Sequence, residues 1–368
     1  MKHIITGGLI GLCLLSSQAH CQAQKTLNFY NWSDYIAEDT IEKFEKETGI
    51  KVNSDVFDSS EVLESKLLTG RSGYDVVVPN AAFMGRHIKA NLYKSLDSRR
   101  LENFKFMDKD LLKAAATQDP NNQHAVPYLW GTTGIGYNLD KIKEVLGEDA
   151  PLNSWSLIFD KNNIEKLAKC GVSVLDTPDE LYPLALNYLG KDPSSKQYAD
   201  YKPKSEAAQL LQDIRPYIGH FHSSAYINNL ANGDICIAIG YSGDILQAKS
   251  RAEEAGNGVN IEYVIPTEGT AVWFDLLAIP NDAKNLESAH EFINFMMRPD
   301  IIADVTNYVS YANANTAATE LQSPDISGNP AIYPNDEIKK RLFMTDERSD
   351  KITKALTRFW TNLKANRQ

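Results

Sequence analysis

Three short segments of the sequence pair an aromatic side chain with a carboxylate, and a fourth is rich in carboxylates. They are Trp32-Ser33-Asp34-Tyr35, Tyr241 with Asp244, Trp273 with Asp275, and Asp176 with Asp179 and Glu180. A buried ammonium group needs a carboxylate partner, and aromatic rings offer flat apolar walls that also attract cations. The combination is typical of a site for a small organic cation with charged ends and an apolar middle, such as an alkyl diamine.

An amino-acid ligand would instead require an arginine for its carboxylate, and none of the four segments contains one. Each residue taken alone is at least as consistent with a place in the core or on the solvated surface. Their common position at predicted strand ends is what favours one shared binding site.

Motifs of enzymes and metal sites are incomplete. HEFIN (290–294) lacks the second histidine of a zinc-protease helix, and GYSGD (240–244) lacks the final glycine of a nucleophile elbow. GIG (134–136) lacks the third glycine of a dinucleotide loop, and His220 and His222 have no second cluster of metal ligands. We therefore expect no enzyme, no cofactor and no metal.

The segments that must position these side chains alternate between strand-like and helical patterns. The predicted strands are 26–30, 51–57 and 75–78, and the predicted helices are 39–48 and 60–68. This alternation indicates an α/β lobe with a largely parallel sheet flanked by helices. Ligands of such sheets bind beyond the carboxyl ends of the strands, so the loops 31–35 and 79–84 are expected at the site.

A second lobe is expected because about 345 residues exceed what one hydrophobic core normally serves. Further strands are predicted at 172–175, 234–239, 261–265 and 272–279, and crossovers between lobes near Gly134 and within 255–260. We assign 24–134 plus 257–315 to lobe 1. We assign 135–256 plus 316–368 to lobe 2, with a helical strap at its carboxyl end.

The amino terminus has the pattern of a secretory signal peptide. Lys2 precedes an apolar run at 4–15, and small and polar residues follow up to Ala23. We expect cleavage after Ala23 and a mature chain that begins near Gln24. No later stretch reaches the roughly 20 apolar residues of a membrane helix. The protein is therefore expected to be exported and water-soluble.

Charge and cysteine content agree with export. The chain has 38 basic and 48 acidic residues, and loss of Lys2 leaves 37 minus 48, a net charge of −11, so nucleic acid is not an expected partner. Two of the four cysteines lie in the expected signal, which leaves Cys170 and Cys236 in an oxidising compartment. We predict a disulfide between them; two separate buried thiols are the alternative.

Four motifs in order along the chain resemble those of periplasmic putrescine/spermidine-binding proteins. They are FYNWSDY (29–35), YDVVVP (74–79), YLWGTTG (128–134) and YANAN (311–315). The resemblance covers essentially the whole mature chain. It implies a two-lobed periplasmic binding fold of type II, which closes on its ligand at a hinge. It also implies a monomer in the periplasm that delivers a polyamine to an inner-membrane ABC permease.

The same resemblance implies which side chains bind the ligand. Carried over by position, they are Trp32, Ser33, Asp34, Tyr35, Trp273, Asp275 and Tyr311 on the first lobe, with Glu180, Ser223, Tyr241 and Asp244 on the second. Asn80, which follows the second motif, and Asp176, from the carboxylate-rich segment, complete the proposed ligand set. Two positions depart from the family, because Tyr241 stands where tryptophan is usual and Asn80 where serine is common. Trp273 is typical of spermidine binders, whereas the motif set resembles the putrescine subgroup, so the length of the polyamine stays open.

Two alternative functions share this pattern, and a third does not. A polyamine sensor that docks a signalling partner would use the same pocket with a different outer surface. A receptor of the same fold for another small organic cation would keep the carboxylates and aromatic walls. A ferric-ion receptor would use adjacent tyrosines, and the sequence has no Tyr-Tyr pair.

Overall fold

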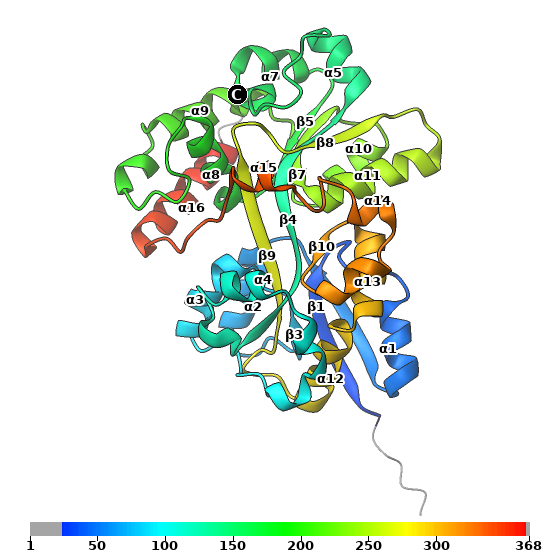
Figure 1. Cartoon of the computed structure of the whole chain (residues 1–368). Coiled ribbons are helices and arrows are strands. Elements are labelled where there is room, and N and C mark those ends of the chain that lie inside the picture. The colour runs from blue at the N-terminus through cyan, green and yellow to red at the C-terminus, as the bar shows by residue number, and fades with distance from the viewer. Residues whose placement is uncertain (1–23, 366–368) are drawn as a thin grey trace, which may run out of the picture.

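Two long strands run between the two lobes of the molecule and join them (Figure 1). They are β4 (Ala125–Asn138) and β9 (Thr270–Ala278), which pair antiparallel from Ala125 opposite Ala278 to Thr132 opposite Val272. The structure is a computed structural model, and it describes residues 24–365. The expected signal peptide at residues 1–23 lies outside the described residues.

The first lobe carries the strand–helix alternation that the sequence predicted. β1 (Thr26–Trp32) pairs in parallel with β2 (Lys51–Phe57) and β3 (Val76–Val77), and β3 meets β9. Helices α1 (Thr40–Thr48) and α2 (Ser60–Leu68) connect these strands. The parallel pairs place the carboxyl ends of β1 and β3 at one edge of the sheet, next to the second lobe.

Local sequence sets the helix boundaries in this lobe. α1 buries Phe44 and ends at Gly49, whose φ of 73° is left-handed and suits glycine. Ser59 begins α2 by accepting a hydrogen bond from the backbone N–H of Val62. Pro299 opens α13 (Pro299–Val309) at a first-turn position, where its missing N–H costs nothing.

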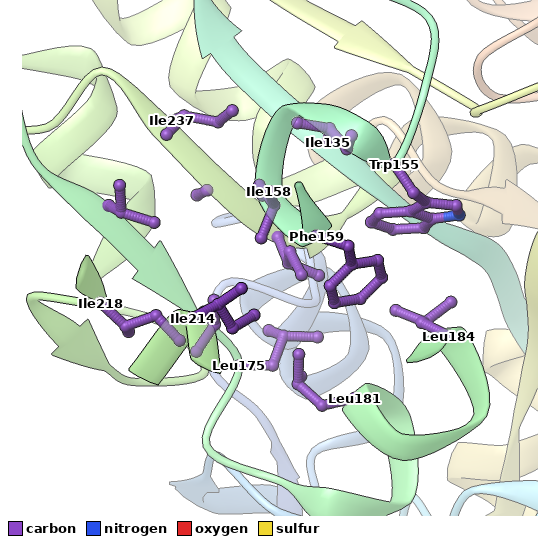
Figure 2. Close-up of a cluster of buried hydrophobic side chains, with 14 of the residues drawn as sticks. Ile135, Trp155, Ile158, Phe159, Leu175, Leu181, Leu184, Ile214, Ile218 and Ile237 are labelled. Atoms are coloured by element: carbon purple, nitrogen blue, oxygen red, sulfur yellow. The ribbon is translucent and has the colours of Figure 1, made fainter. Parts of the chain in front are cut away.

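The second lobe continues the same sheet. β7 (Ile237–Tyr241) pairs antiparallel with β4 and in parallel with β5 (Val172–Val174), which pairs with β6 (His220–Phe221). Figure 2 shows the core between this sheet and its helices, where residues such as Trp155 and Phe159 pack closely. Both side chains are at most 2% exposed, so the second lobe has a hydrophobic core of its own.

The remaining strands are short. They are β8 (Ile261–Val264), β10 (Ala312–Asn313) and β11 (Leu342–Phe343). The remaining α-helices are α3 (Ala81–Lys89), α4 (Lys109–Ala115), α5 (Leu139–Leu146), α6 (Ser156–Phe159), α7 (Lys161–Leu167), α8 (Pro178–Tyr188), α9 (Glu206–Ile214), α10 (Tyr226–Ala231), α11 (Ser242–Ala255), α12 (Leu286–Met296), α14 (Pro324–Ser327), α15 (Asp336–Lys339) and α16 (Asp350–Ala365). In residues 24–365 no helix combines the length and apolar character of a membrane span.

The hydrophobic cores divide the chain differently from the sequence analysis at two segments. β8 pairs with the last residues of β4, and Ile261 packs in the second core, although we assigned this strand to lobe 1. Ala318 packs in the first core and the Tyr333 ring contacts Trp130, although we assigned residues from 316 onward to lobe 2. The helical strap, α16, packs on the second core through Leu356.

Cys170 and Cys236 form a disulfide, with their Cα atoms 5.4 Å apart. It links the turn that follows α7 to the residue that precedes β7, across a sequence separation of 66 residues. The two cysteines therefore tie that turn to the edge of a central strand of the second lobe.

Replacing both Cys170 and Cys236 by serine is expected to lower the free energy of unfolding by about 4 kcal/mol. The physical reason is that the unfolded chain gains the conformational freedom of a long open loop. Chemical denaturation of both forms would measure the difference. Because the disulfide lies away from the cavity described below, ligand affinity should be retained, and equal unfolding midpoints would contradict a stabilising role.

Candidate ligand-binding site

A cavity of about 420 Å³ lies between the two lobes, lined by residues 271–275 of β9 and by loops from both sides. It brings together eleven of the thirteen residues proposed from the sequence. They are Trp32, Ser33, Tyr35, Asn80, Glu180, Ser223, Tyr241, Asp244, Trp273, Asp275 and Tyr311. Other lining residues that the ligand set lacked include Glu61, Asp179 and Asp346.

Asp275 is a deeply buried carboxyl group that lines the cavity from the first-lobe side, with 4% of its surface exposed. Its Oδ2 accepts a hydrogen bond from the Tyr35 hydroxyl at 2.9 Å, and its Oδ1 accepts one from Asn80 Nδ2 at 3.1 Å. Burial raises the pKa of Asp275 to about 8, although these two hydrogen bonds act in the opposite direction. A nearby cation would stabilise the ionised form.

The loop that carries Tyr35 is held from three sides. The carbonyl of Tyr35 accepts hydrogen bonds from Asn31 Nδ2 and from the Tyr128 hydroxyl, and the N–H of Ser33 donates to the Phe57 carbonyl. Asn80 begins α3 and holds that end by accepting from the N–H of Ala82. These hydrogen bonds hold the backbone at Tyr35 and the side chain of Asn80, the two residues that bond to Asp275.

Asp244 is the corresponding carboxyl on the second-lobe side. It lies in the first turn of α11, and its two oxygens accept hydrogen bonds from the hydroxyls of Tyr226 at 2.6 Å and Tyr311 at 2.5 Å. Tyr311 belongs to the first lobe, so this contact crosses the cleft. Burial raises the pKa of Asp244 to about 7, against the effect of both hydrogen bonds.

Two further carboxyls, Glu180 and Glu61, approach from helices on opposite lobes. Glu180 Oε2 accepts a hydrogen bond from Thr133 Oγ1 at 2.8 Å, and burial raises its pKa to about 7. Glu61, on α2, accepts from Thr177 Oγ1 at 3.3 Å across the cleft. Burial and the negative charge of Asp179 raise the pKa of Glu61 to about 7.

An aromatic wall formed by Trp273, Tyr241 and Tyr311 also lines the cavity. The Trp273 ring meets Tyr241 edge-on with centroids 5.4 Å apart, and it meets Tyr311 in the same manner at 5.5 Å. Trp273 lies opposite Gly131 of β4. A Cβ atom at Gly131 would come within 2.9 Å of the Trp273 ring and 2.8 Å of Ser242 Oγ, so only glycine leaves room for the indole there.

Replacing Gly131 by alanine is therefore expected to displace Trp273 and weaken ligand binding by about tenfold, since well-packed sites tolerate overpacking poorly. Isothermal titration would measure the loss. Gly219→Ala is the matched control, because a Cβ there would contact only the Val172 carbonyl at 3.5 Å. Equal affinity of the Gly131→Ala and control proteins would contradict this account of the wall.

Two residues of the proposed ligand set do not line the cavity. Asp34 is exposed, has a left-handed φ of 54°, and its Oδ1 accepts from Arg251 Nη2 at 2.6 Å. Asp176 forms an ion pair with Lys364 at 2.6 Å and accepts a hydrogen bond from Trp360 Nε1. The first pair joins the two lobes at their rim, and the second holds α16 on the second lobe.

The charged side chains that line the cavity in residues 24–365 are all acidic, and aromatic rings lie among them. It contains seven carboxyl side chains, and among the described residues that line it there is no lysine, arginine or histidine. Within residues 24–365, Asp244, Asp275 and Glu180 form no ion pair with any basic side chain, and no three potential metal ligands of the His, Cys, Asp and Glu types cluster together. The arrangement suits an organic cation.

Comparisons with known proteins agree with this geometry. The family model described as bacterial extracellular solute-binding protein matches residues 39–334. The chain is 51% identical over 367 residues to the putrescine-binding periplasmic protein PotF of Escherichia coli (strain K12), covering 100% of this chain and 98% of the relative. It is 52% identical to the putrescine-binding periplasmic protein SpuD of Pseudomonas aeruginosa, covering 98% of each.

A solved structure gives the same result for the fold. The spermidine/putrescine ABC transporter substrate-binding protein PotD of Streptococcus pneumoniae superposes with a TM-score of 0.73 at 29% identity. The match covers 94% of this chain and 100% of the other. Such neighbours confirm the expected α/β fold of two lobes. The chain belongs to the bacterial extracellular solute-binding protein family, whose members bind solutes for transport rather than catalyse reactions.

Proposed function

We propose that this protein is the polyamine-binding component of an ABC uptake system and works in the periplasm. The observation that carries the proposal is the set of three carboxyl groups, Asp275, Asp244 and Glu180, which share one aromatic cavity and form no ion pair with a basic side chain of residues 24–365. The names of the relatives, which bind putrescine or spermidine, support the same ligand class.

The physical argument rests on the cost of buried charge. An ionised carboxylate without a partner is expensive to bury, and the raised pKa values of all three groups reflect that cost. A ligand ammonium removes the cost by pairing with the carboxylate, and each charge-assisted hydrogen bond contributes about 1.5–3 kcal/mol. The methylenes of a polyamine lie against Trp273 and Tyr241.

Ligand capture is coupled to closure because the carboxyls come from different lobes. Asp275 is supplied by β9 on the first-lobe side, whereas Asp244 and Glu180 are supplied by α11 and α8 of the second lobe. A ligand that pairs with all three binds the closed form better than an open one and shifts the population toward it. The closed form is then the state that a permease recognises.

Isothermal titration tests the ligand class. The exported protein is purified, freed of ligand by unfolding and refolding, and titrated with putrescine, cadaverine, spermidine, spermine and arginine. We expect saturable one-to-one binding of at least one polyamine and none of arginine, since none of the described residues that line the cavity is basic and able to receive a carboxylate. Absence of binding by all four polyamines would overturn the proposal.

Export and transport are tested in cells. We expect the protein in the periplasmic fraction, shortened by the 23 residues of the proposed signal, and monomeric by light scattering. Deleting the gene should abolish high-affinity uptake of a radiolabelled polyamine. Normal uptake together with an altered transcriptional response to polyamines would instead favour a sensor.

A further inference from the structure

Tyr241 differs from the other tyrosines around the cavity in the hydrogen bonding of its hydroxyl. Tyr35 donates to Asp275, and Tyr226 and Tyr311 donate to Asp244. In the part of the chain that the structure describes, the Tyr241 hydroxyl forms no hydrogen bond, although its backbone N–H donates to the Tyr226 oxygen at 3.0 Å. A phenol that lines a cavity in this state is free to bind a ligand atom.

The register of the sheet places Tyr241 beside Glu180. Tyr241 of β7 lies directly opposite Thr133 of β4, and the Thr133 hydroxyl donates to Glu180. Directly opposed residues of an antiparallel pair project their side chains from the same face of the sheet. The Tyr241 ring and the Glu180 carboxyl are therefore neighbours on the cavity side.

Asp275 and Asp244 also lie close to Tyr241. Tyr241 packs edge-on against Trp273, and Trp273 is two residues before Asp275 on β9, so both project from one face of the strand. Asp244 follows Tyr241 by three residues in the first turn of α11. Tyr241 is thus a neighbour of Glu180 and of both aspartates.

The charges that act on the Tyr241 phenol agree with its place near these carboxyls. Burial raises the pKa of Tyr241 well above its usual value, and the charges of Glu180, Asp244, Asp275 and Glu61 raise it further, in that order. The phenol is therefore neutral at any physiological pH. Its oxygen keeps a lone pair that can accept a hydrogen bond from a cation.

We propose that Tyr241 determines polyamine specificity, because its hydroxyl accepts a hydrogen bond from an internal ammonium group of the ligand. This inference rests on the proposed function. A ligand that extends from the two aspartates to Glu180 passes the Tyr241 hydroxyl with its middle. A triamine presents an N–H there, whereas a diamine presents methylenes that cannot use the hydroxyl. Tyr241 therefore favours a triamine such as spermidine over a diamine.

A cycle of two proteins and two ligands tests this role. The ligands are spermidine and 1,8-diaminooctane, which have the same chain length and differ in whether the internal position is NH or CH₂. Isothermal titration of wild type and Tyr241→Phe should show spermidine affinity falling about tenfold or more in the variant. The affinity for 1,8-diaminooctane, and that for putrescine, should change by no more than about twofold by the same reasoning.

Tyr182→Phe is the matched control, because it removes a tyrosine hydroxyl that bonds only to Asp200 and Ser205, outside the cavity lining. Its affinities should equal those of wild type. The specificity role would be overturned if Tyr241→Phe lost equal affinity for spermidine and 1,8-diaminooctane, or lost affinity for neither. It would also be overturned if the wild-type protein bound putrescine but not spermidine. Each of these results would leave the proposed function intact. A wild-type protein that binds no polyamine would overturn both.

Discussion

Asp275→Asn is expected to weaken polyamine binding by about 2–4 kcal/mol while leaving the protein folded. The variant keeps the shape of the side chain but cannot pair with an ammonium group, and a buried cation that loses its partner is costly. Isothermal titration with the best-bound polyamine would measure the loss. Thermal unfolding of the same samples would show whether the fold is intact.

The Asp275→Asn substitution should not lower the unfolding temperature, because an amide can form the hydrogen bonds that the Asp275 carboxyl forms. The asparagine oxygen can accept from Asn80 Nδ2, and its NH₂ group can donate to the Tyr35 hydroxyl, which is able to rotate its proton away. The substitution also removes a carboxyl whose ionisation is opposed by burial. We therefore expect an unfolding temperature equal to or above that of the ligand-free wild type.

Asp176→Asn is the matched control for this prediction. Asp176 also belonged to the proposed ligand set, but the structure places it in an ion pair with Lys364 outside the cavity. The control should keep its ligand affinity. If Asp275→Asn binds polyamines as tightly as Asp176→Asn does, the carboxyl of Asp275 takes no part in recognition.

Many residues that line the cavity could be predicted from the sequence, because the alternation of residue types along a short segment indicates where a strand ends. β1 ends at Trp32 and β3 is followed by Asn80, and the rule that ligands bind beyond the carboxyl ends of parallel strands identified both loops. Asp275 and Trp273 share one face of β9 through the two-residue period of a strand. These features depend on neighbours in sequence.

The direction of a side chain at a strand end depends on distant partners, and here the sequence analysis failed. The left-handed backbone of Asp34 directs its carboxyl toward Arg251, 217 residues away. Asp176 faces Lys364, which α16 brings back after 188 residues. Neither partner could be inferred from local spacing, because the local sequence does not determine the surface on which a helix such as α11 or α16 packs.

The residues that hold the carboxyls in place were missed for a related reason. Thr133 meets Glu180 only because the register of β4 and β7 sets it opposite Tyr241. Tyr226 reaches Asp244 from the separate helix α10. Hydroxyl groups of this kind are common throughout the sequence, and only a tertiary contact distinguishes the ones that orient a functional carboxyl.

Ligand affinity should rise with pH between about 6 and about 8, because binding expels protons. In the ligand-free protein burial raises the pKa of Asp275 to about 8 and those of Asp244 and Glu180 to about 7. A bound ammonium favours the ionised carboxylates, so each group that must ionise weakens binding by up to about tenfold per pH unit below its pKa. Titration in buffers of different ionisation enthalpy would count the protons released.

The stability of the ligand-free protein should show the opposite trend. A carboxyl whose pKa is raised by folding does not lower the free energy of unfolding below its unfolded pKa of about 4, because it is protonated in both the folded and the unfolded protein. As pH rises toward 8 the unfolded state ionises first, and the folded state loses stability until its own carboxyls ionise. We therefore expect these groups to lower the unfolding temperature between pH 5 and pH 8 without ligand, and a saturating polyamine to remove much of that decline. An unfolding temperature with the same pH dependence in both conditions, and no proton release on binding, would mean that these carboxyls are already ionised in the empty cavity.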